Sequence, residues 1–475
     1  MNKIYKIFLV LALVYLGSAC TNDFLDRDPH TSISDSKALS SYDKLKLATN
    51  GLYANFITTG LYGEFMVLGP DVMSDNVIRS SVKSSGRYIQ EFNLTVGATE
   101  SSPASLYGDL YYTVNAACNV INAIEGGKFD KQGASEAQIN QLLGEALFVK
   151  AWCHFDACRY FAYPYNFTDA ALAPGANGAG GHPGVPLITK MEIQEVGRST
   201  VNEVYESVIG DLKRAATLMT VQKKACWASA EVAKAMLARV YLYKEDYENA
   251  AKMATEVIGS GRYSLTAANN FVTYWTKGEQ PETIFEIQIN KSDDNFYGGN
   301  NNPGGVYLYY GDLVASRKLV DLYEDNDVRL KLVELNGDGE YTVKKYPGRA
   351  DAGSIEINNA NILRLAEMYL IRAEANFKGK KAIGDTPLND INELRTHRGL
   401  SKISEVTNTI IEEERQKELA FEGHRLFDLG RNKQNNVRPE CNATPLVTYP
   451  DKRYIFPIPL YEMNNNENME QTIGY

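Results

Sequence analysis

The chain of 475 residues has few of the side chains that most often carry catalysis. Its five histidines are His30, His154, His182, His397 and His424, and none of them falls in an H-E-x-x-H or similar metal spacing. A G-x-S-x-G nucleophile motif and a phosphate-binding P-loop are also missing from the sequence. The sequence therefore predicts no zinc site and lacks the minimum parts of the common hydrolases and NTPases.

Basic side chains are in the minority. The 49 Lys and Arg residues face 59 Asp and Glu residues, which gives a formal net charge of -10 at pH 7. A protein that binds nucleic acid through its phosphates needs a basic face, so nucleic acid is not an expected partner. The hydrophobic share of 44% is ample for a large core, which excludes a disordered chain.

Cysteine is scarce as well. Beyond Cys20, five cysteines remain, an odd number that permits at most two disulfides. Four of the five lie in or beside helical patterns, where a thiol acts as a small apolar filler. We expect mostly free, buried thiols. The sequence leaves disulfides open as an alternative, because the N-terminal leader described next would place the protein outside the cytoplasm. The five are Cys118, Cys153, Cys158, Cys226 and Cys441.

The N-terminus is typical of a bacterial lipoprotein leader. Residues 1–6 are basic, residues 7–16 form an apolar run too short to span a bilayer, and small residues precede Cys20. Removal of residues 1–19 would leave Cys20 to carry several fatty acyl chains, which attach a protein to a membrane far more durably than one chain does. The alternative is a plain secretory leader with a chance cysteine.

One stretch reads as a complete helical hairpin, from Val232 to Gly259. Leu237, Ala238 and Tyr241 fall on one face of its first helix, and Ala250 and other small or apolar residues on the facing side of its second. The spacing resembles the tetratricopeptide repeat, a helix pair of about 34 residues. Such a unit cannot bury its apolar face alone, so other helices must stack on it.

The rest of the chain alternates between helical periods and irregular segments. We expect a mainly α fold in which a tetratricopeptide-like scaffold of helix pairs carries long irregular insertions with short strands. Residues 20–475 would form a single domain. The scaffold covers about 36–68, 105–163, 200–265 and 360–432, the insertions about 69–104, 164–199 and 266–359, and an extended tail residues 433–475.

Motifs along nearly the whole chain resemble those of the SusD family, also called RagB/SusD. They include LDRDP, GPDVMSDN, GEALFVKAW, LRLAEMYLIRAEA, EEERQKELAFEGHRLFDLGR and the FPIP to GY ending, in the family's order. The resemblance implies a helical lipoprotein of the outer membrane, exposed on the cell surface. It also implies capture of a nutrient, usually a glycan, together with a SusC-like TonB-dependent transporter. The departures are small: Lys150 stands where Arg is usual, and Thr472-Ile473 where Asn-Pro is usual.

Two carboxylates in the last strong helical pattern could be mistaken for a glycosidase pair. Glu418 and Glu422 are four residues apart, which on a helix places them about 5 to 6 Å from each other. Ion pairs of Glu422 with Arg425 and of Asp428 with Arg431 explain these carboxylates better. The sequence is therefore interpreted as that of a protein that is not an enzyme.

Ligand residues are expected in the irregular segments, because loops on a rigid scaffold usually carry binding sites. Sugar rings pack on aromatic rings, and their hydroxyls bond to amide, carboxylate and guanidinium groups. Trp152 is expected in the core instead, and Trp275 could equally anchor its insertion on the scaffold. The candidates are Asp75, Asn76, Arg79, Arg87 and Tyr88 in the first insertion, and Trp275, Phe296, Tyr297, Tyr307, Tyr309 and Tyr310 in the central one.

A cluster of oxygen ligands in the central insertion is the one candidate for a bound cofactor. Asp293, Asp294 and Asn295, with the asparagines at 300–302, would suit calcium. The D-x-D-x-D-G spacing with a distant Glu is missing, so a solvated loop is favoured over a calcium site.

Two functions remain open at this point. One is a non-catalytic surface protein that binds a glycan or oligosaccharide. The other has the same transporter partnership but binds peptides, for which the loops would form an extended groove.

Replacement of Cys20 tests the membrane attachment. We expect Cys20→Ala to remain unacylated and to enter the aqueous phase in a detergent phase-partition assay, because the acyl chains supply the membrane affinity. Unchanged partitioning of the variant would contradict the lipoprotein prediction.

Overall fold

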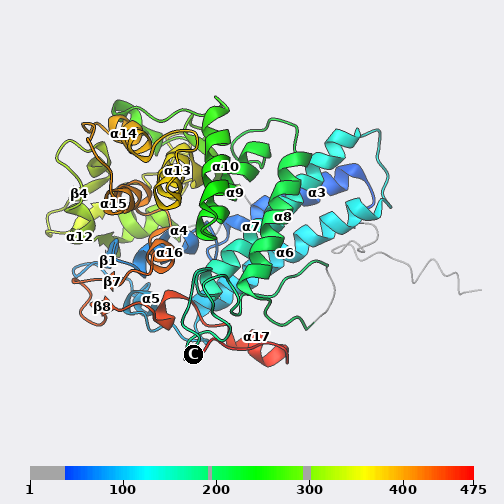
Figure 1. Ribbon diagram of the computed structural model, residues 1–475, viewed down its shortest axis with the longest axis horizontal. Coiled ribbons are helices and arrows are strands. Elements are labelled where there is room, and N and C mark those ends of the chain that lie inside the picture. Colours follow the sequence, from blue (N-terminus) through cyan, green and yellow to red (C-terminus); the bar gives the residue numbers. More distant parts are fainter. Residues whose placement is uncertain (1–37, 191–194, 293–300) are drawn as a thin grey trace, which may run out of the picture.

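A computed structural model describes residues 38–190, 195–292 and 301–475 of the chain. Most of the long helices form one continuous stack, with α6, α7 and α8 on one side of the molecule, α9 and α10 in the middle and α13 to α15 on the other side (Figure 1). The predicted mainly α fold is confirmed. The stacked helices are α3 (Tyr42–Ala54), α6 (Ser101–Gly126), α7 (Glu136–Phe161), α8 (Val201–Leu218), α9 (Ala230–Tyr243), α10 (Tyr247–Gly259), α13 (Leu365–Gly379), α14 (Pro387–His397) and α15 (Asn408–Leu419).

The predicted hairpin is present as α9 and α10. Ser229 caps α9 by accepting the N–H of Val232, and Asp246 caps α10 by accepting the N–H of Asn249. Ala238 and Ala250 are fully buried, and their small side chains let the two backbones approach closely. Neighbouring helices cover the hairpin on both sides, with α8 packed on α9 and α13 packed on α10.

Strands occur only as short pieces in the described residues. A four-stranded sheet has the order β1-β3-β5-β4, and Val77 pairs with Ala315 in its antiparallel β1–β3 register. The first predicted insertion is thereby joined to the central one. The strands are β1 (Val77–Arg79), β2 (Thr283–Ile287), β3 (Leu313–Ala315), β4 (Val333–Leu335), β5 (Tyr341–Val343), β6 (Ala360–Arg364), β7 (Asn436–Val437) and β8 (Leu446–Val447), of which β2 pairs with β6 and β7 with β8.

Shorter helical segments fill the connections and the tail. Two of them, α4 and α5, lie in the region where the sequence shows little helical period. The segments are η2 (Asn55–Ile57), α4 (Phe65–Val72), α5 (Ile89–Asn93), η3 (Ala268–Asn270), α11 (Phe271–Tyr274), η4 (Gly305–Tyr310), α12 (Arg317–Val320), η5 (Val328–Leu332), α16 (Arg425–Arg431), η6 (Lys452–Tyr454) and α17 (Leu460–Asn465).

The last strong helical pattern is broken by a turn, which corrects the prediction of one continuous helix. The first helix of this pattern, α15, ends at Leu419, and α16 begins at Arg425. Between them Phe421 and Gly423 adopt positive φ of 67° and 76°. A Cβ on Gly423 would lie 2.1 Å from the carbonyl oxygen of Met66, so only glycine fits this position.

Glu422 lies in this turn, and its expected pair with Arg425 is wrong. Its carboxylate accepts hydrogen bonds from Arg364 (Nη2 to Oε1, 2.6 Å) and from Lys345 (Nζ to Oε1, 2.7 Å). Arg425 instead bonds to Asp75, with Nε 2.7 Å from Oδ1. The cause is the turn, which removes the helical spacing on which the expected pair depended.

The expected pair of Asp428 with Arg431 is confirmed, with 2.8 Å between Oδ1 and Nε. Trp152 is fully buried and stacks on Phe56 with ring centroids 3.9 Å apart, as expected for a core residue. The five cysteines of the described residues are free, and all except the half-buried Cys226 are buried. The predicted free thiols are thus confirmed.

Loss of the Glu422 charge should destabilise the fold. Burial opposes ionisation of Glu422, but Arg364 and Lys345 outweigh it and lower its pKa. We expect Glu422→Gln to lose about 3 kcal/mol of unfolding free energy at neutral pH, because Lys345 would remain buried without a carboxylate. Urea denaturation measures this.

Exposed Glu405 provides the control, since Glu405→Gln should have little effect. A lowered pKa contributes stability above the ordinary carboxyl pKa, and the contribution is lost as pH falls through the folded value. The difference between wild type and Glu422→Gln should therefore shrink in acid. A difference that is absent at neutral pH, or equally large at every pH, would contradict this account.

Candidate ligand-binding site

Residues 80–88 of the first insertion are fastened to the central insertion. Ser85 donates its backbone N–H to Asp312 (2.5 Å to Oδ1), and Ser80 donates its hydroxyl to Glu340 (2.6 Å to Oε2). Tyr88 follows with a left-handed φ of 57° and begins α5. The side chains of this loop are therefore held by contacts more than 200 residues distant in sequence.

Arg87 joins the two predicted ligand segments. Its guanidinium donates to the Asn301 side-chain oxygen (2.8 Å), lies 3.5 Å from the Asp312 carboxylate and packs over the Tyr310 ring at 4.0 Å. Tyr309 is next to Tyr310, with ring centroids 5.1 Å apart, and its side chain is 63% exposed. Arg87, Tyr309 and Tyr310 thus form one surface, which we call the Arg87 face.

An open cleft of about 270 Å³ adjoins the Arg87 face. Tyr88 donates its hydroxyl to Glu64 (2.7 Å to Oε1), and its ring lies nearly parallel to that of Phe65 at 6.3 Å. Burial raises the pKa of Glu64. The lining residues are Thr59, Gly60, Glu64, Phe65, Arg87, Tyr88, Glu91, Ser101, Ser102, Ser105 and Asn301.

Two of the candidate residues hold the backbone beneath this site and do not reach the cleft. Asp75 is buried and paired with Arg425 and Lys318. Burial opposes its ionisation, but these two cations outweigh burial and lower its pKa to about 2. Asn76 is also buried, donates to Asp71 (2.6 Å) and accepts from Gln416 (2.8 Å). Both side chains are therefore engaged within the protein.

Two aromatic candidates are core residues. Tyr307 is fully buried, with its ring parallel to that of Tyr346 at 6.3 Å. Trp275 is 7% exposed and packs edge-to-face on Tyr274, with Lys345 over its ring at 4.3 Å. The Arg364 guanidinium, from the scaffold segment that begins at about residue 360, also lies over the Trp275 ring at 5.3 Å. Trp275 therefore packs inside the central insertion and contacts the scaffold, which was one of its two expected roles.

The remaining candidates are Arg79, Cys20 and the segment from 293 to 297. Arg79 lies on β1 and donates to the Ser84 hydroxyl (2.6 Å). The other candidates lie outside the described residues: Cys20, Phe296, Tyr297 and the calcium candidates Asp293, Asp294 and Asn295. Within the described residues no group of three or more His, Cys, Asp or Glu side chains could hold a metal ion.

Sequence reasoning missed several residues that line the cleft. Glu64 precedes a fully apolar run, and Ser101 and Ser102 begin the long helix α6, so each looks like an ordinary helix-terminus residue. Glu91 lies in the five-residue helix α5. A local pattern contains no signal for these positions, because only the fold brings them beside Arg87.

The suspected glycosidase pair is fixed in ion pairs. Glu418 accepts hydrogen bonds from Arg398 (2.8 Å) and Arg364 (2.9 Å). Burial opposes its ionisation, but these guanidinium groups hold its pKa well below the usual range. A general acid must keep a proton near neutral pH, which Glu418 does not do.

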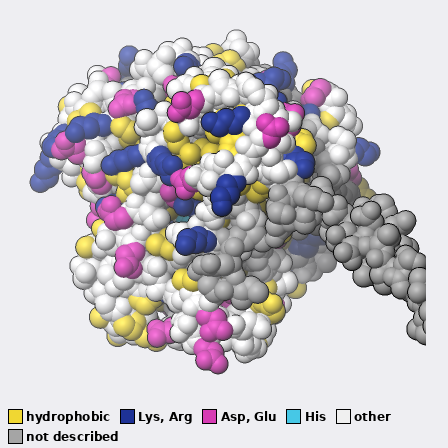
Figure 2. Space-filling view, turned by 90° about the vertical axis from the view of Figure 1, so that its right-hand side faces the viewer, with side chains coloured by type: hydrophobic (Ala, Val, Ile, Leu, Met, Phe, Trp, Pro, Cys, Tyr) yellow, Lys and Arg dark blue, Asp and Glu magenta, His cyan; other side chains and the backbone are white. Residues whose placement is uncertain are grey.

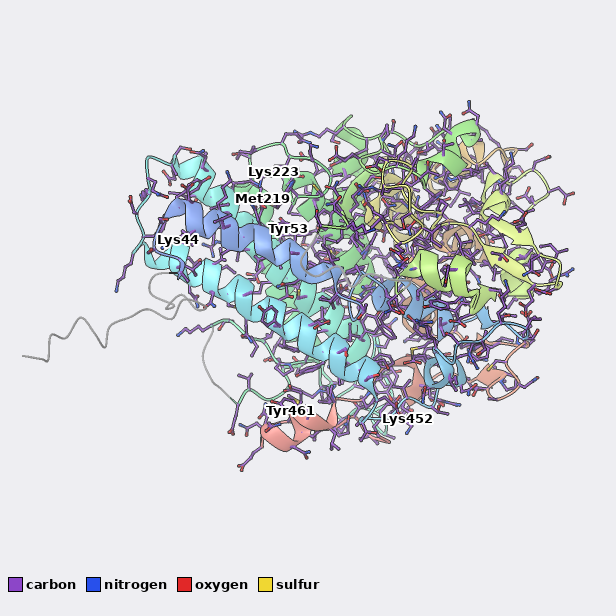
Figure 3. The ribbon with its side chains drawn as sticks, turned by 180° about the vertical axis from the view of Figure 1, so that it is seen from behind. Lys44, Tyr53, Met219, Lys223, Lys452 and Tyr461 are labelled. Atoms are coloured by element: carbon purple, nitrogen blue, oxygen red, sulfur yellow. The ribbon has the colours of Figure 1, made fainter. Side chains whose placement is uncertain are left out.

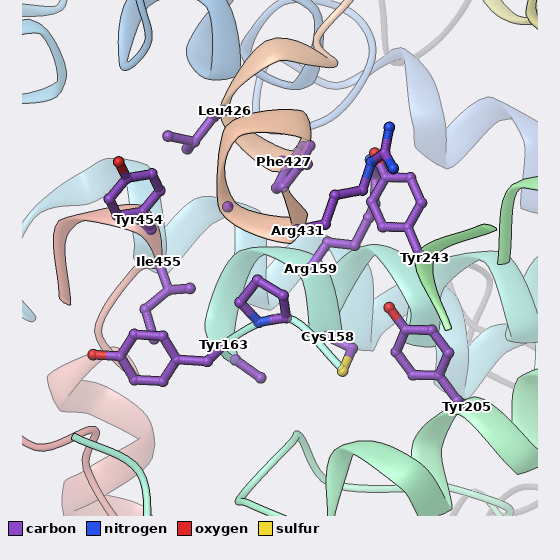
Figure 4. A pocket seen from close by; sticks show the side chains of 13 residues that line it. Cys158, Arg159, Tyr163, Tyr205, Tyr243, Leu426, Phe427, Arg431, Tyr454 and Ile455 are labelled. Carbon is purple, nitrogen blue, oxygen red and sulfur yellow. The ribbon is translucent and has the colours of Figure 1, made fainter. Parts of the chain in front are cut away.

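A small, partly open cavity lies between α7, α16 and the C-terminal tail (Figure 4). Its volume of about 20 Å³ suits a single water molecule rather than a sugar or a peptide. Tyr163 and Tyr243 line it with buried hydroxyls, and Cys158 lines it with a thiol whose pKa burial raises to about 12. This cavity is therefore a packing defect, and its thiol is unreactive.

The described helices include none that is long and apolar enough to cross a membrane. On the face of the molecule shown in Figure 2, Lys and Arg side chains are interspersed with Asp and Glu side chains. This face therefore presents no continuous basic surface of the kind that nucleic-acid binding requires.

Comparisons with known proteins agree with this architecture. Residues 23–242 match the family model described as "Starch-binding associating with outer membrane", and residues 334–475 match the SusD family model. A SusD superfamily protein from Bacteroides vulgatus has a solved structure with a TM-score of 0.81 and 30% identity, over 92% of this chain and 99% of that one.

Two curated relatives complete the comparison. SusD-like protein P38 of Formosa agariphila is 26% identical, over 98% of both chains. Starch-binding protein SusD of Bacteroides thetaiotaomicron is 36% identical over 123 residues, which cover 24% of this chain and 21% of that protein. The chain belongs to the SusD family, as its sequence motifs predict.

Two tyrosines of η4 should differ in their contribution to folding. We expect Tyr307→Ala to lose about 3–5 kcal/mol of unfolding free energy, because the ring is fully buried. Tyr309→Ala should change it by less than about 0.5 kcal/mol, because the ring is mostly exposed. Urea denaturation of both variants measures the difference, and equal losses would contradict the difference in burial between the two rings.

Proposed function

We propose that this protein is a surface-exposed, lipid-anchored protein of the outer membrane that binds a glycan or oligosaccharide without cleaving it. The observation that carries the proposal is the Arg87 contact, which joins two irregular segments into one surface with the exposed Tyr309 beside an open cleft. Family membership supports the same conclusion, since relatives bear starch-binding names.

The chemistry of the site suits a carbohydrate. Tyr309 and Tyr310 offer aromatic rings on which the C–H face of a sugar ring can pack, and Arg87 places charged donors beside them. Glu64, Glu91 and the serine hydroxyls at the start of α6 supply acceptors and donors for sugar hydroxyls inside the cleft. A few polar groups fixed beside apolar surface are what a small-molecule site requires.

The state of two carboxylates supports binding without catalysis. Glu418 and Glu422 are buried and held ionised by guanidinium groups, so neither can act as a general acid. Glu64 has a raised pKa, but its carboxylate already accepts the Tyr88 hydroxyl. Because Glu64 lines the cleft, we assign it to ligand contact and not to catalysis.

The lipoprotein leader supports the location, and the family supports a TonB-dependent, SusC-like transporter as the partner that receives the ligand. We expect no cofactor; the weaker alternative of calcium at Asp293, Asp294 and Asn295 is tested by metal titration.

Peptide binding is the second candidate. It is favoured by the position of β1 at the edge of its sheet, because an edge strand can pair with an extended peptide. With only three residues, β1 offers few main-chain hydrogen bonds, so we rank this function below glycan binding.

Substitution of residues on the Arg87 face tests the proposed ligand-binding site. The ligand is first identified by screening residues 21–475 on a glycan array and a peptide library. We expect Tyr309→Ala and Arg87→Ala to remain folded and to weaken binding of that ligand by about 1–3 kcal/mol in calorimetric titration, the range of an anchor residue at a binding site. The ligand should be recovered uncleaved.

Tyr112→Ala is the matched control, because Tyr112 on α6 is 68% exposed but does not line the cleft. The site assignment would be overturned if both Arg87-face variants bind the ligand normally and a substitution on the α9–α10 hairpin abolishes binding. Hits on the peptide library alone would favour the second candidate.

A further inference from the structure

A second open cleft lies between the connection before α9, the segment after α10 and the start of β2. Its volume is about 260 Å³, and it shares no lining residue with the cleft beside Arg87. The side chains that could meet a ligand there are Lys223, Lys224, Trp227, Arg262, Tyr263 and Gln280. We call this second site the Trp227 cleft.

The Trp227 cleft has the opposite charge balance from the protein as a whole. Three cations, Lys223, Lys224 and Arg262, line it with a single carboxylate, that of Glu279. Each cation has a carboxylate partner, but the partners of Lys223 and Arg262, which are Glu145 and Glu231, are not among the lining residues, so the lining itself is cationic. The cleft beside Arg87, in contrast, has two carboxylates and one guanidinium.

The inner part of the Trp227 cleft is pre-positioned. Trp227 packs edge-to-face on Tyr53 with ring centroids 4.9 Å apart, and the Lys223 ammonium lies 5.1 Å above its ring. Lys223 is held by an ion pair with the buried Glu145, which also accepts the Tyr53 hydroxyl at 2.9 Å. Lys223 and Tyr53 are labelled in Figure 3. A ligand therefore meets a fixed aromatic ring with a fixed cation beside it.

The outer cations have partners that a ligand can replace. Lys224 lies 3.2 Å from Glu279, and both side chains are well exposed, at 72% and 38%. Arg262 lies 2.9 Å from Glu231 and is 42% exposed. The Lys224–Glu279 pair is exposed on both sides and contributes about 0–1 kcal/mol, so an anionic ligand can replace it at little cost, whereas the Glu231 partner of Arg262 is only 16% exposed.

Main-chain recognition of a peptide is disfavoured at the Trp227 cleft. The N–H of Glu286 on β2 already donates to the carbonyl of Ala225 (3.0 Å), and the other edge of β2 pairs with β6. The carbonyl of Pro281 accepts the N–H of Ser264 (3.0 Å). These contacts occupy the main-chain groups that β-strand addition of a peptide would use.

We propose that the Trp227 cleft binds an acidic oligosaccharide, with a sugar ring against Trp227 or Tyr263 and its anionic group between Lys224 and Arg262. Uronic acid carboxylates and sulfate esters share this chemistry. The Trp227 cleft is separate from the Arg87 face, so the proposal for one site can be refuted while the proposal for the other stands.

Calorimetric titration of residues 21–475 tests the proposal with three probes. Tetragalacturonate presents carboxylates, and a chondroitin sulfate tetrasaccharide presents carboxylates and sulfates. Methyl-esterified tetragalacturonate has the same sugar rings as tetragalacturonate but carries no charge. We expect at least one charged probe to bind in the millimolar range or tighter, the methyl ester to bind at least about tenfold more weakly, and added salt to weaken binding.

The double variant Lys224→Ala/Arg262→Ala, at two exposed positions, should weaken the charged probe by about tenfold or more. Lys128→Ala/Lys402→Ala removes two exposed cations elsewhere and should leave binding unchanged. Arg87→Ala should also leave it unchanged, which separates this site from the proposed glycan site. The proposal would be overturned if neither charged probe binds, or if the methyl ester binds as tightly as the charged probe. It would also be overturned if the Lys224/Arg262 variant binds the charged probe as tightly as the wild type does.

Discussion

The fold depends on a buried network of carboxylates and guanidinium groups at the C-terminal end of the helical stack. Arg364 and Arg398 are almost completely buried, and both donate to Glu418 and Glu282. Isolated charges at this depth would be strongly unfavourable, so each one requires its partners. The network therefore fixes β6, α15 and the segment before β2 relative to one another.

Contacts next to this network also position the proposed ligand site. After α15 the chain makes the turn that contains Glu422, and the N–H groups of Phe421 (3.3 Å) and Gly423 (2.9 Å) donate to Asp71 of α4. Asp75, four residues later, pairs with Arg425 of α16. These contacts orient the chain that enters β1, and β1 leads into the loop that carries Arg87. The strongly charged motif of the C-terminal helices thus holds the elements that carry the proposed site, and its side chains do not line the cleft.

The helical part of this architecture could be predicted from the sequence, because apolar periodicity is a local property. The α9–α10 hairpin shows this, with Ala238 and Ala250 buried as their spacing requires. The local pair of Asp428 with Arg431 could be predicted as well. The pairs of Glu422 could not, since Arg364 lies 58 residues before Glu422 and the turn at Phe421 has a non-glycine residue with positive φ.

The candidate site was predictable in kind but not in detail. Arg87, Tyr309 and Tyr310 were found because no helical period claims them for a core, yet Tyr307 satisfies the same criterion and is fully buried. A single residue, Leu308, separates the buried from the exposed tyrosine within η4, and only the packing of that segment distinguishes them. Glu64 and Ser101 enter the site through tertiary contacts that leave no trace in the local sequence.

The central claim is that ligand recognition takes place on irregular segments held by a rigid helical stack. The most direct measurement is a crystal structure of residues 21–475 with the oligosaccharide that a glycan array selects. The account predicts a sugar ring against Tyr309 or Tyr310 with a hydroxyl bonded to Arg87, on an unchanged stack. Sugar bound instead across the α9–α10 hairpin, with the Arg87 face empty, would contradict it.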